Sequence, residues 1–265
     1  MTRPRPSVRR KLAVATWRAP RDGRLHARLA IDASALVAYC TRKREETGVK
    51  VTPGVVVGVA FHRGVLAVPA FHNRVVFGRI VPFTSHEVAF AVDIGAGDDL
   101  APTKIDVEGK SVVEVARELA AGAERLRTGR DEDFETMSRI VNAVPWWALR
   151  PAMSVNSLIN GGIGVRALGL PAHSLGSMFV SNIGSIGLDE AYMAPVPPGR
   201  VPLYVCVGVV SDAPMAVDGQ VVVRPQLVLT VTADHRLVDG AHAAALARVV
   251  RTALAEPDRL DLPPG

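Results

Sequence analysis

The sequence predicts an α/β fold, because strand-like and helix-like segments alternate along its 265 residues. Between residues 25 and 31 apolar side chains alternate with polar or small ones, a pattern typical of a half-buried strand. A capping box formed by Ser111 and Glu114 begins the most regular amphipathic helix. Apolar strand-like segments then return in the second half, before a last helix from Gly240 to Ala255.

Two helices are expected between residues 32 and 64. Asp32 is expected to cap the first, which ends at Gly48. Thr52 and Pro53 fit an N-cap followed by a first-turn proline, so they predict a second helix that Gly64 would end. The valines of this second segment are equally compatible with a strand.

The remaining elements follow from the same periodicities. Val88–Ile94 is predicted to be a strand, and the helix that begins at Ser111 keeps one apolar stripe as far as Gly129. Another helix is expected from Asp131. The expected strands of the second half are Met178–Ile183, Leu203–Val210 and Gln226–Thr232, and Pro257 is expected to stop the last helix.

Charge divides the chain into a basic N-terminal arm, residues 1–11, and a single domain, residues 12–265. Residues 1–30 carry nine basic side chains and one acidic one, whereas the remainder has a net charge of −3. A basic arm is able to contact nucleic acid, but Trp17 alone offers an aromatic ring for stacking. The sequence therefore disfavours a nucleic-acid-binding function.

Composition excludes several other classes of protein. Hydrophobic residues make up 48% and charged residues 22%, which is the composition of an ordered globular protein. The longest apolar stretch, Val55–Phe71, is interrupted by His62 and Arg63, so we expect no membrane span. Cys40 and Cys206 lie too far apart in the sequence to suggest a disulfide framework, which favours a cytoplasmic location.

Two familiar kinds of binding site are not supported. Gly162, Gly164 and Ala167 superficially match a dinucleotide-binding fingerprint, but Ser154–Asn160 is a poor candidate for the strand that must precede one. We interpret this glycine-rich stretch as a loop. The seven histidines are not spaced as metal ligands, so no metal site is expected.

The segment Thr230–Ala244, TVTADHRLVDGAHAA, is the most informative part of the chain. It places His235 where a strand gives way to a helix, with Asp239 four residues later. An imidazole is the natural general base near neutral pH. An ordinary capped junction between a strand and a helix explains the same residues.

Two blocks in the second half resemble one known family. His235-Arg-Leu-Val-Asp239-Gly240 resembles the active-site signature of the chloramphenicol acetyltransferase superfamily. Its longer form, with Asp234 before it and Ala241 after it, is similar to the catalytic domain of the dihydrolipoyl acyltransferases of 2-oxoacid dehydrogenase complexes. The stretch Gly176–Gly184, GSMFVSNIG, resembles that family's serine-bearing strand. Relative to the family, residues 131–173 look like an insertion, and no lipoyl or subunit-binding domain is found.

The resemblance implies a two-layer α/β sandwich, with a mixed sheet packed against helices, that assembles as a homotrimer or a multiple of trimers. It implies that His235 of one protomer and Ser181 of its neighbour share an active site. His235 would take the proton of an attacking thiol, and Ser181 would stabilise the oxyanion. CoA would be a substrate, with no metal and no lipoyl group attached to this chain, and a lipoyl domain is a possible partner in trans.

The resemblance also implies structural roles around the histidine. Asp239 is expected to form a salt bridge with Arg9 or Arg10 that holds the histidine loop, although a solvated tail explains these two arginines equally well. Asn182 and Gly240 are expected to maintain backbone geometry.

Three functions remain open at this level. The first is acyl transfer between CoA and a dihydrolipoyl-type thiol. The second is a CoA-dependent acyltransferase with a hydroxyl or amine acceptor on a small molecule. The third is a catalytically silent trimeric scaffold, which the intact His235, Ser181 and Asp239 argue against.

Overall fold

The computed structural model describes residues 23–94, 100–166, 172–173, 175–196 and 199–262. The basic arm, including Arg9 and Arg10, lies outside these residues. Within them the chain forms a mixed six-stranded sheet in the order β1-β8-β7-β6-β4-β5. β6 runs parallel to both of its neighbours, and the other pairs are antiparallel. The strands of this sheet are β1 (Arg24–Asp32), β4 (Glu87–Asp93), β5 (Leu100–Asp106), β6 (Met178–Asn182), β7 (Leu203–Val217) and β8 (Gln220–Asp234).

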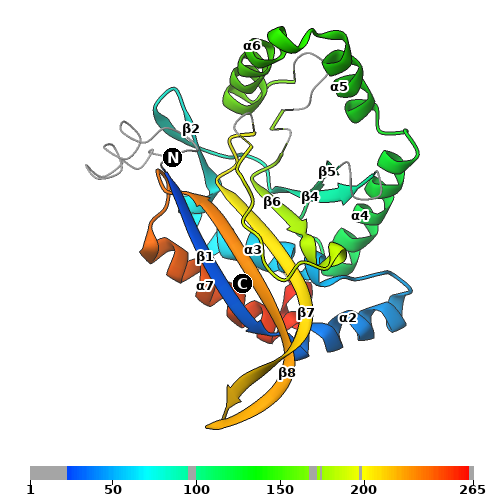
Figure 1. Ribbon diagram of the computed structural model, residues 1–265, viewed down its shortest axis with the longest axis vertical. Coiled ribbons are helices and arrows are strands. Elements are labelled where there is room, and N and C mark those ends of the chain that lie inside the picture. The colour runs from blue at the N-terminus through cyan, green and yellow to red at the C-terminus, as the bar shows by residue number, and fades with distance from the viewer. Residues whose placement is uncertain (1–22, 95–99, 167–171, 174, 197–198, 263–265) are drawn as a thin grey trace.

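Helices cover one face of the sheet, as Figure 1 shows for α2, α3 and α7. Alternate residues of the strands point into this layer, and the two sides form one core that includes Leu229 and Val205 with Val56 and Leu246. The chain is therefore the two-layer α/β sandwich that the resemblance implied. The helices are α2 (Ser34–Thr47), α3 (Pro53–Ala67), α4 (Val112–Arg127), α5 (Glu132–Ala143), α6 (Trp146–Asn156) and α7 (Gly240–Ala255).

Shorter elements complete the fold. A two-stranded sheet pairs β2 (Asn73–Val76) with β3 (Arg79–Pro82). Single helical turns are η1 (Pro69–His72), η2 (Ser157–Ile163), η3 (Ile183–Ile186) and η5 (Pro257–Asp261). No helix in the described ranges has both the length and the apolar run that crossing a membrane requires.

Several predicted elements are confirmed with small changes. Ser111 and Glu114 form the capping box of α4, and Gly48 closes α2 in the left-handed conformation. The helix alternative is right for α3, but Gly64 does not end it. The glycine instead allows close packing, because a Cβ there would overlap the side chain of Leu246 on α7. The expectation that Asp32 is the N-cap of α2 was wrong, because Asp32 is the last residue of β1 and the N-cap is Ala33; the Asp32 carboxylate accepts the amide of Ser34.

Two predictions about the second half were wrong in extent or type. β7 and β8 continue beyond the predicted Val210 and Gln226 and join in a long hairpin, seen at the lower end of Figure 1. Asp218 and Gly219 both have positive φ at its tip, as a two-residue hairpin turn requires. The glycine-rich stretch is not a loop, because Ser157–Ile163 forms a π-helical turn after α6. A helix thus stands where a dinucleotide fingerprint would need a strand.

Candidate active site

His235 lies in the turn between β8 and α7, and the backbone of this turn fixes its ring. Its Nδ1 is 2.5 Å from the carbonyl oxygen of Val238. A carbonyl oxygen only accepts hydrogen bonds, so Nδ1 carries the proton and Nε2 is the basic nitrogen. The amide of His235 donates to Gly23 at 2.6 Å, which ties the turn to the start of β1. The ring is half-buried.

Ser181 lies on β6, on the face of the sheet opposite the helices. Its neighbours Val180 and Met178 belong to the core between sheet and helices, so the alternation of the strand turns Ser181 the other way. Cys206 on β7 stands beside it in register. Residues 187–196 pass over this face, and we call them the covering segment. The hydroxyl of Thr230 donates to Ala191, and Leu188 accepts from Val209 at 3.0 Å.

A cavity of about 280 Å³, the Ser181 cavity, lies between this face and the covering segment. Phe179 and Cys206 line it from the sheet, and Tyr192 and Met193 line it from the covering segment. Burial raises the pKa of the Cys206 thiol, so the thiol stays protonated at neutral pH. Ser181 thus lines a pocket that is partly open to solvent, since the lining residues Leu100 and Tyr192 are exposed.

The fold does not bring Ser181 and His235 together within one chain. Ser181 is in register with Cys206, and Cys206 is in register with Thr230, two strands from β6. His235 follows Thr230 by five residues. At about 4.8 Å per strand and 3.3 Å per residue, the two residues are roughly 15–20 Å apart. This separation is too large for both to touch one reacting atom of a ligand bound to a single chain.

Asp239 is the N-cap of α7, as the alternative of an ordinary capped junction predicted. Its carboxylate accepts from the amides of Ala241 and His242, and it lies 2.7 Å from His242 Nδ1. The signal was present, because aspartate is a preferred N-cap and a histidine three residues later is able to face it. The expected pairing with Arg9 or Arg10 concerns residues outside the described ranges and remains a prediction.

The two residues expected to maintain backbone geometry differ in their surroundings. The side chain of Asn182 lies against α3, where a Cβ at Gly54 would come within 3.3 Å of it. Gly240 begins α7, and a Cβ there would meet no atom within 4 Å. The structure therefore gives no steric reason for a glycine at position 240.

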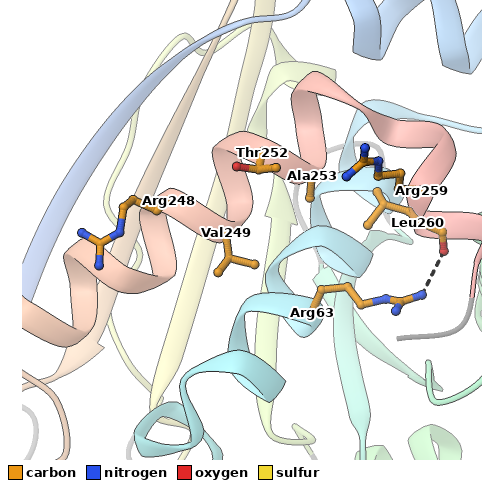
Figure 2. Close-up of a pocket in the computed structure, with 7 residues that line it drawn as sticks. All are labelled: Arg63, Arg248, Val249, Thr252, Ala253, Arg259 and Leu260. Atoms are coloured by element: carbon orange, nitrogen blue, oxygen red, sulfur yellow. Dashed lines mark hydrogen bonds between the residues drawn. The ribbon is translucent and has the colours of Figure 1, made fainter. Parts of the chain in front are cut away.

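A second hollow, of about 390 Å³, lies on the outer side of the helix layer. Figure 2 shows Arg63, Arg248 and Arg259 around a floor that includes Val249 and Leu260, and Arg63 donates to the Leu260 carbonyl at 3.3 Å. None of the predicted site residues lines it. In the described part of the chain no cluster of histidine, cysteine and carboxylate side chains suits a metal ion.

Comparison with known proteins finds one family that part of this chain resembles. Residues 168–262 match the family model described as 2-oxoacid dehydrogenases acyltransferase (catalytic domain). This part of the chain is similar to the catalytic domain that the model describes. The matched residues contain Ser181, His235 and Asp239, so both sequence blocks that carried the resemblance lie within the acyltransferase region.

Curated acyltransferases match over short stretches. The acetyltransferase component of a pyruvate dehydrogenase complex from Mycoplasma capricolum is 36% identical over 78 residues, which is 29% of this chain and 17% of that protein. The succinyltransferase component of a 2-oxoglutarate dehydrogenase complex from Pseudomonas aeruginosa is 41% identical over 51 residues, 19% of this chain and 12% of that protein. The matches thus span less than a fifth of the length of these relatives.

Solved structures extend the likeness of the fold to most of the chain. A dihydrolipoamide acetyltransferase structure from Listeria monocytogenes has a TM-score of 0.66 at 18% identity and covers 88% of this chain and 84% of that one. Chloramphenicol acetyltransferase has a TM-score of 0.52 at 14% identity, covering 92% and 94%. The fold shared with these structures therefore includes the first half of this chain, which the family model does not match.

Proposed function

We propose that this chain is an acyltransferase that moves an acyl group between CoA and a dihydrolipoyl-type thiol by direct thioester exchange. The observation that carries the proposal is the fixed ring of His235, with Nδ1 2.5 Å from the Val238 carbonyl and Nε2 left as the basic nitrogen. The reaction class is supported by the family of residues 168–262 and by the curated relatives, which are dihydrolipoyllysine-residue acyltransferases.

His235 acts as the general base in this proposal. A thiol with an ordinary pKa near 8.5 is about 3% thiolate at pH 7, so removing its proton as it attacks accelerates the reaction. The proton passes from the dihydrolipoyl sulfur to Nε2, and the sulfur bonds to the carbonyl carbon of acyl-CoA. When the tetrahedral intermediate collapses, its bond to the CoA sulfur breaks and the proton on Nε2 passes to that sulfur.

Ser181 stabilises the tetrahedral intermediate. Its hydroxyl donates a hydrogen bond to the oxygen that becomes negatively charged as the thiolate adds. A donor placed in this way contributes about 2.7–4 kcal/mol to catalysis. The position of Ser181 beside a cavity, on a strand whose backbone is fixed by both neighbours, supports this role.

The active site is proposed to form between two copies of the chain. Within one chain His235 and Ser181 are separated by two strands and five residues, so a second copy is needed to bring one of each together. A homotrimer, in which each copy contributes His235 to one site and Ser181 to the next, provides this arrangement. We expect the acceptor thiol to be presented by a lipoyl domain in trans, in the cytoplasm.

The assay that tests the proposal compares acceptors. We expect the purified chain to transfer acetyl from acetyl-CoA to free dihydrolipoamide, and His235→Ala to abolish the transfer. A panel of small alcohols and amines is run in parallel, because chloramphenicol acetyltransferase shares the fold of this chain. Transfer to alcohols or amines and not to dihydrolipoamide would reject the proposed acceptor. Absence of transfer to any acceptor would favour a silent scaffold.

A further inference from the structure

The Ser181 cavity is lined by uncharged side chains. Its polar lining residues are Ser181, Tyr192 and Cys206, and the remaining lining residues are apolar. None of the residues that line it in the described part of the chain is charged. The covering segment carries two charged residues, Asp189 and Glu190, and Glu190 is paired with Arg28 at 2.7 Å and hydrogen-bonded to Tyr192.

The lining that one chain supplies offers no cation to a negative charge. A carboxylate transferred from water into an apolar environment without a cation loses several kcal/mol of hydration. The three polar groups of the lining are neutral donors, and Cys206 is a weak one. A ligand that ends in a carboxylate would therefore bind in this cavity far more weakly than one that ends in a methyl group.

The volume of the cavity exceeds what an acetyl group needs. At about 30 Å³ for each water molecule of the liquid, 280 Å³ corresponds to roughly nine waters. An acetyl group contributes three heavy atoms, so several further methylene groups fit. Each buried methylene strengthens binding about fourfold, which is the usual 0.8 kcal/mol expressed as a ratio.

We infer that the Ser181 cavity holds the alkyl end of an uncharged acyl group longer than acetyl and discriminates against acyl groups that end in a carboxylate. The inference rests on the proposed acyl transfer and names its substrate class. It sets this chain apart from the relatives that are succinyltransferases, whose acyl group ends in a carboxylate.

Butanoyl-CoA and succinyl-CoA make a matched pair of probes, because both carry a four-carbon acyl chain and only the second ends in a carboxylate. With dihydrolipoamide as acceptor, we expect kcat/KM for butanoyl-CoA to exceed that for succinyl-CoA at least 100-fold, and that for acetyl-CoA about tenfold. Equal or higher kcat/KM with succinyl-CoA would overturn the inference while leaving acyl transfer in place.

A charge introduced into the lining tests the cause of the preference. Met193 lies on the covering segment and lines the cavity, so Met193→Lys supplies the missing cation. We expect it to lower the butanoyl-to-succinyl ratio of kcat/KM at least tenfold, chiefly by improving succinyl-CoA. Met193→Leu is the matched control, since it keeps the volume without the charge, and it should keep the wild-type ratio.

Binding without turnover separates this inference from the proposed function. Calorimetric titration of the wild-type chain with CoA, butanoyl-CoA and succinyl-CoA needs no acceptor. Tighter binding of butanoyl-CoA than of CoA, with no gain for succinyl-CoA, would support the cavity assignment even if dihydrolipoamide is not the acceptor. Equal binding of all three, together with equal turnover of both acyl-CoAs, would reject the assignment.

Discussion

His235 and Val238 are joined by a hydrogen bond of 2.5 Å from the ring Nδ1 to the backbone carbonyl. The partner belongs to the backbone of the same turn, so the path of the chain helps to set the ring orientation. A backbone carbonyl accepts hydrogen bonds and never donates them, so the basic lone pair of the neutral ring is on Nε2.

His235→Ala should lower kcat at least 100-fold, because loss of a general base costs about that factor. The oligomeric state measured by light scattering should not change. His86→Gln is a matched control, since His86 is half-buried and lies in another part of the fold, and it should keep kcat within about threefold. Turnover of His235→Ala at the wild-type rate would contradict the assignment.

Ser181→Ala should lower kcat 100- to 1000-fold with little change in KM, because an oxyanion donor acts mainly in the transition state. Ser185→Ala is the control, as the exposed Ser185 hydroxyl donates to Asn182 at 2.6 Å outside the cavity. A change confined to KM would make Ser181 a substrate contact.

Mixtures of Ser181→Ala and His235→Ala subunits test the shared site directly. If each site takes one residue from each of two copies, exchange of subunits creates some sites in which both residues are wild type. We expect activity to appear on mixing and to follow the rate of subunit exchange, measured with a fluorescent label. Exchange without recovered activity would count against a site between copies.

Stability should fall as the pH drops from about 6.5 to 4. Burial, His86 and His72 lower the pKa of His62 to about 4, and burial, Arg74 and Lys104 lower that of His173 to about 4. The unfolded chain takes up these protons near pH 6.5 and the folded chain only near pH 4, so stability is greatest above pH 6.5.

His62→Gln checks this origin, because it removes the titrating group on α3 and keeps a polar side chain. In the wild-type chain His62 Nε2 lies 3.3 Å from His86 Nδ1, and His72, Arg63 and Asp106 are also near the His62 ring. Urea unfolding at pH 7 and pH 4.5 should show that the variant loses less stability than wild type, by about 2 kcal/mol. His26→Gln serves as the control, and an unchanged pH slope in His62→Gln would remove His62 from the explanation.

Local pattern predicted most elements of this fold, but not their tertiary relations. Ser111 with Glu114, and Gly48, carry their structural information within a few residues, so their helices were predicted correctly. The extent of the β7–β8 hairpin was missed, although Asp218-Gly219 is a typical turn pair between valine-rich segments. The Ser181 cavity could not be predicted, because it depends on a covering segment that returns across β6 and β7.

Substitutions of Asp239 distinguish two roles of its carboxylate, which are capping α7 and pairing with an arginine of the N-terminal arm. Asparagine caps a helix about as well as aspartate, so Asp239→Asn should keep the cap of α7, whereas Asp239→Ala loses about 1 kcal/mol. If Asp239 also pairs with Arg9 or Arg10, Asp239→Asn breaks that pair at a cost of about 3–5 kcal/mol.

We expect the tether, and therefore a large fall in Tm for Asp239→Asn. Deletion of residues 1–11 should lower Tm similarly, whereas deletion of residues 1–6, which leaves both arginines, should not. At about 2–4 °C for each kcal/mol in a chain of this size, the two explanations differ by roughly 5 °C or more. If the Tm of Asp239→Asn equals that of the wild type, Asp239 caps α7 and does not hold the N-terminal arm.

Gly208 lies where β7 and the covering segment pass close to each other. A Cβ at Gly208 would overlap the carbonyl of Asp189, which is backbone and cannot turn aside. Gly208→Ala should therefore push the covering segment away from the sheet and open the Ser181 cavity, since Ala191, Tyr192 and Met193 follow directly in the chain. The butanoyl preference should then weaken, because the alkyl end would no longer be enclosed.

Gly219→Ala at the hairpin tip controls for general loss of stability. Its Cβ meets no atom within 4 Å, and only the positive φ of this position strains an alanine, at a cost of about 1 kcal/mol in stability. It should keep the butanoyl preference, and an unchanged preference in Gly208→Ala would show that the covering segment does not set it.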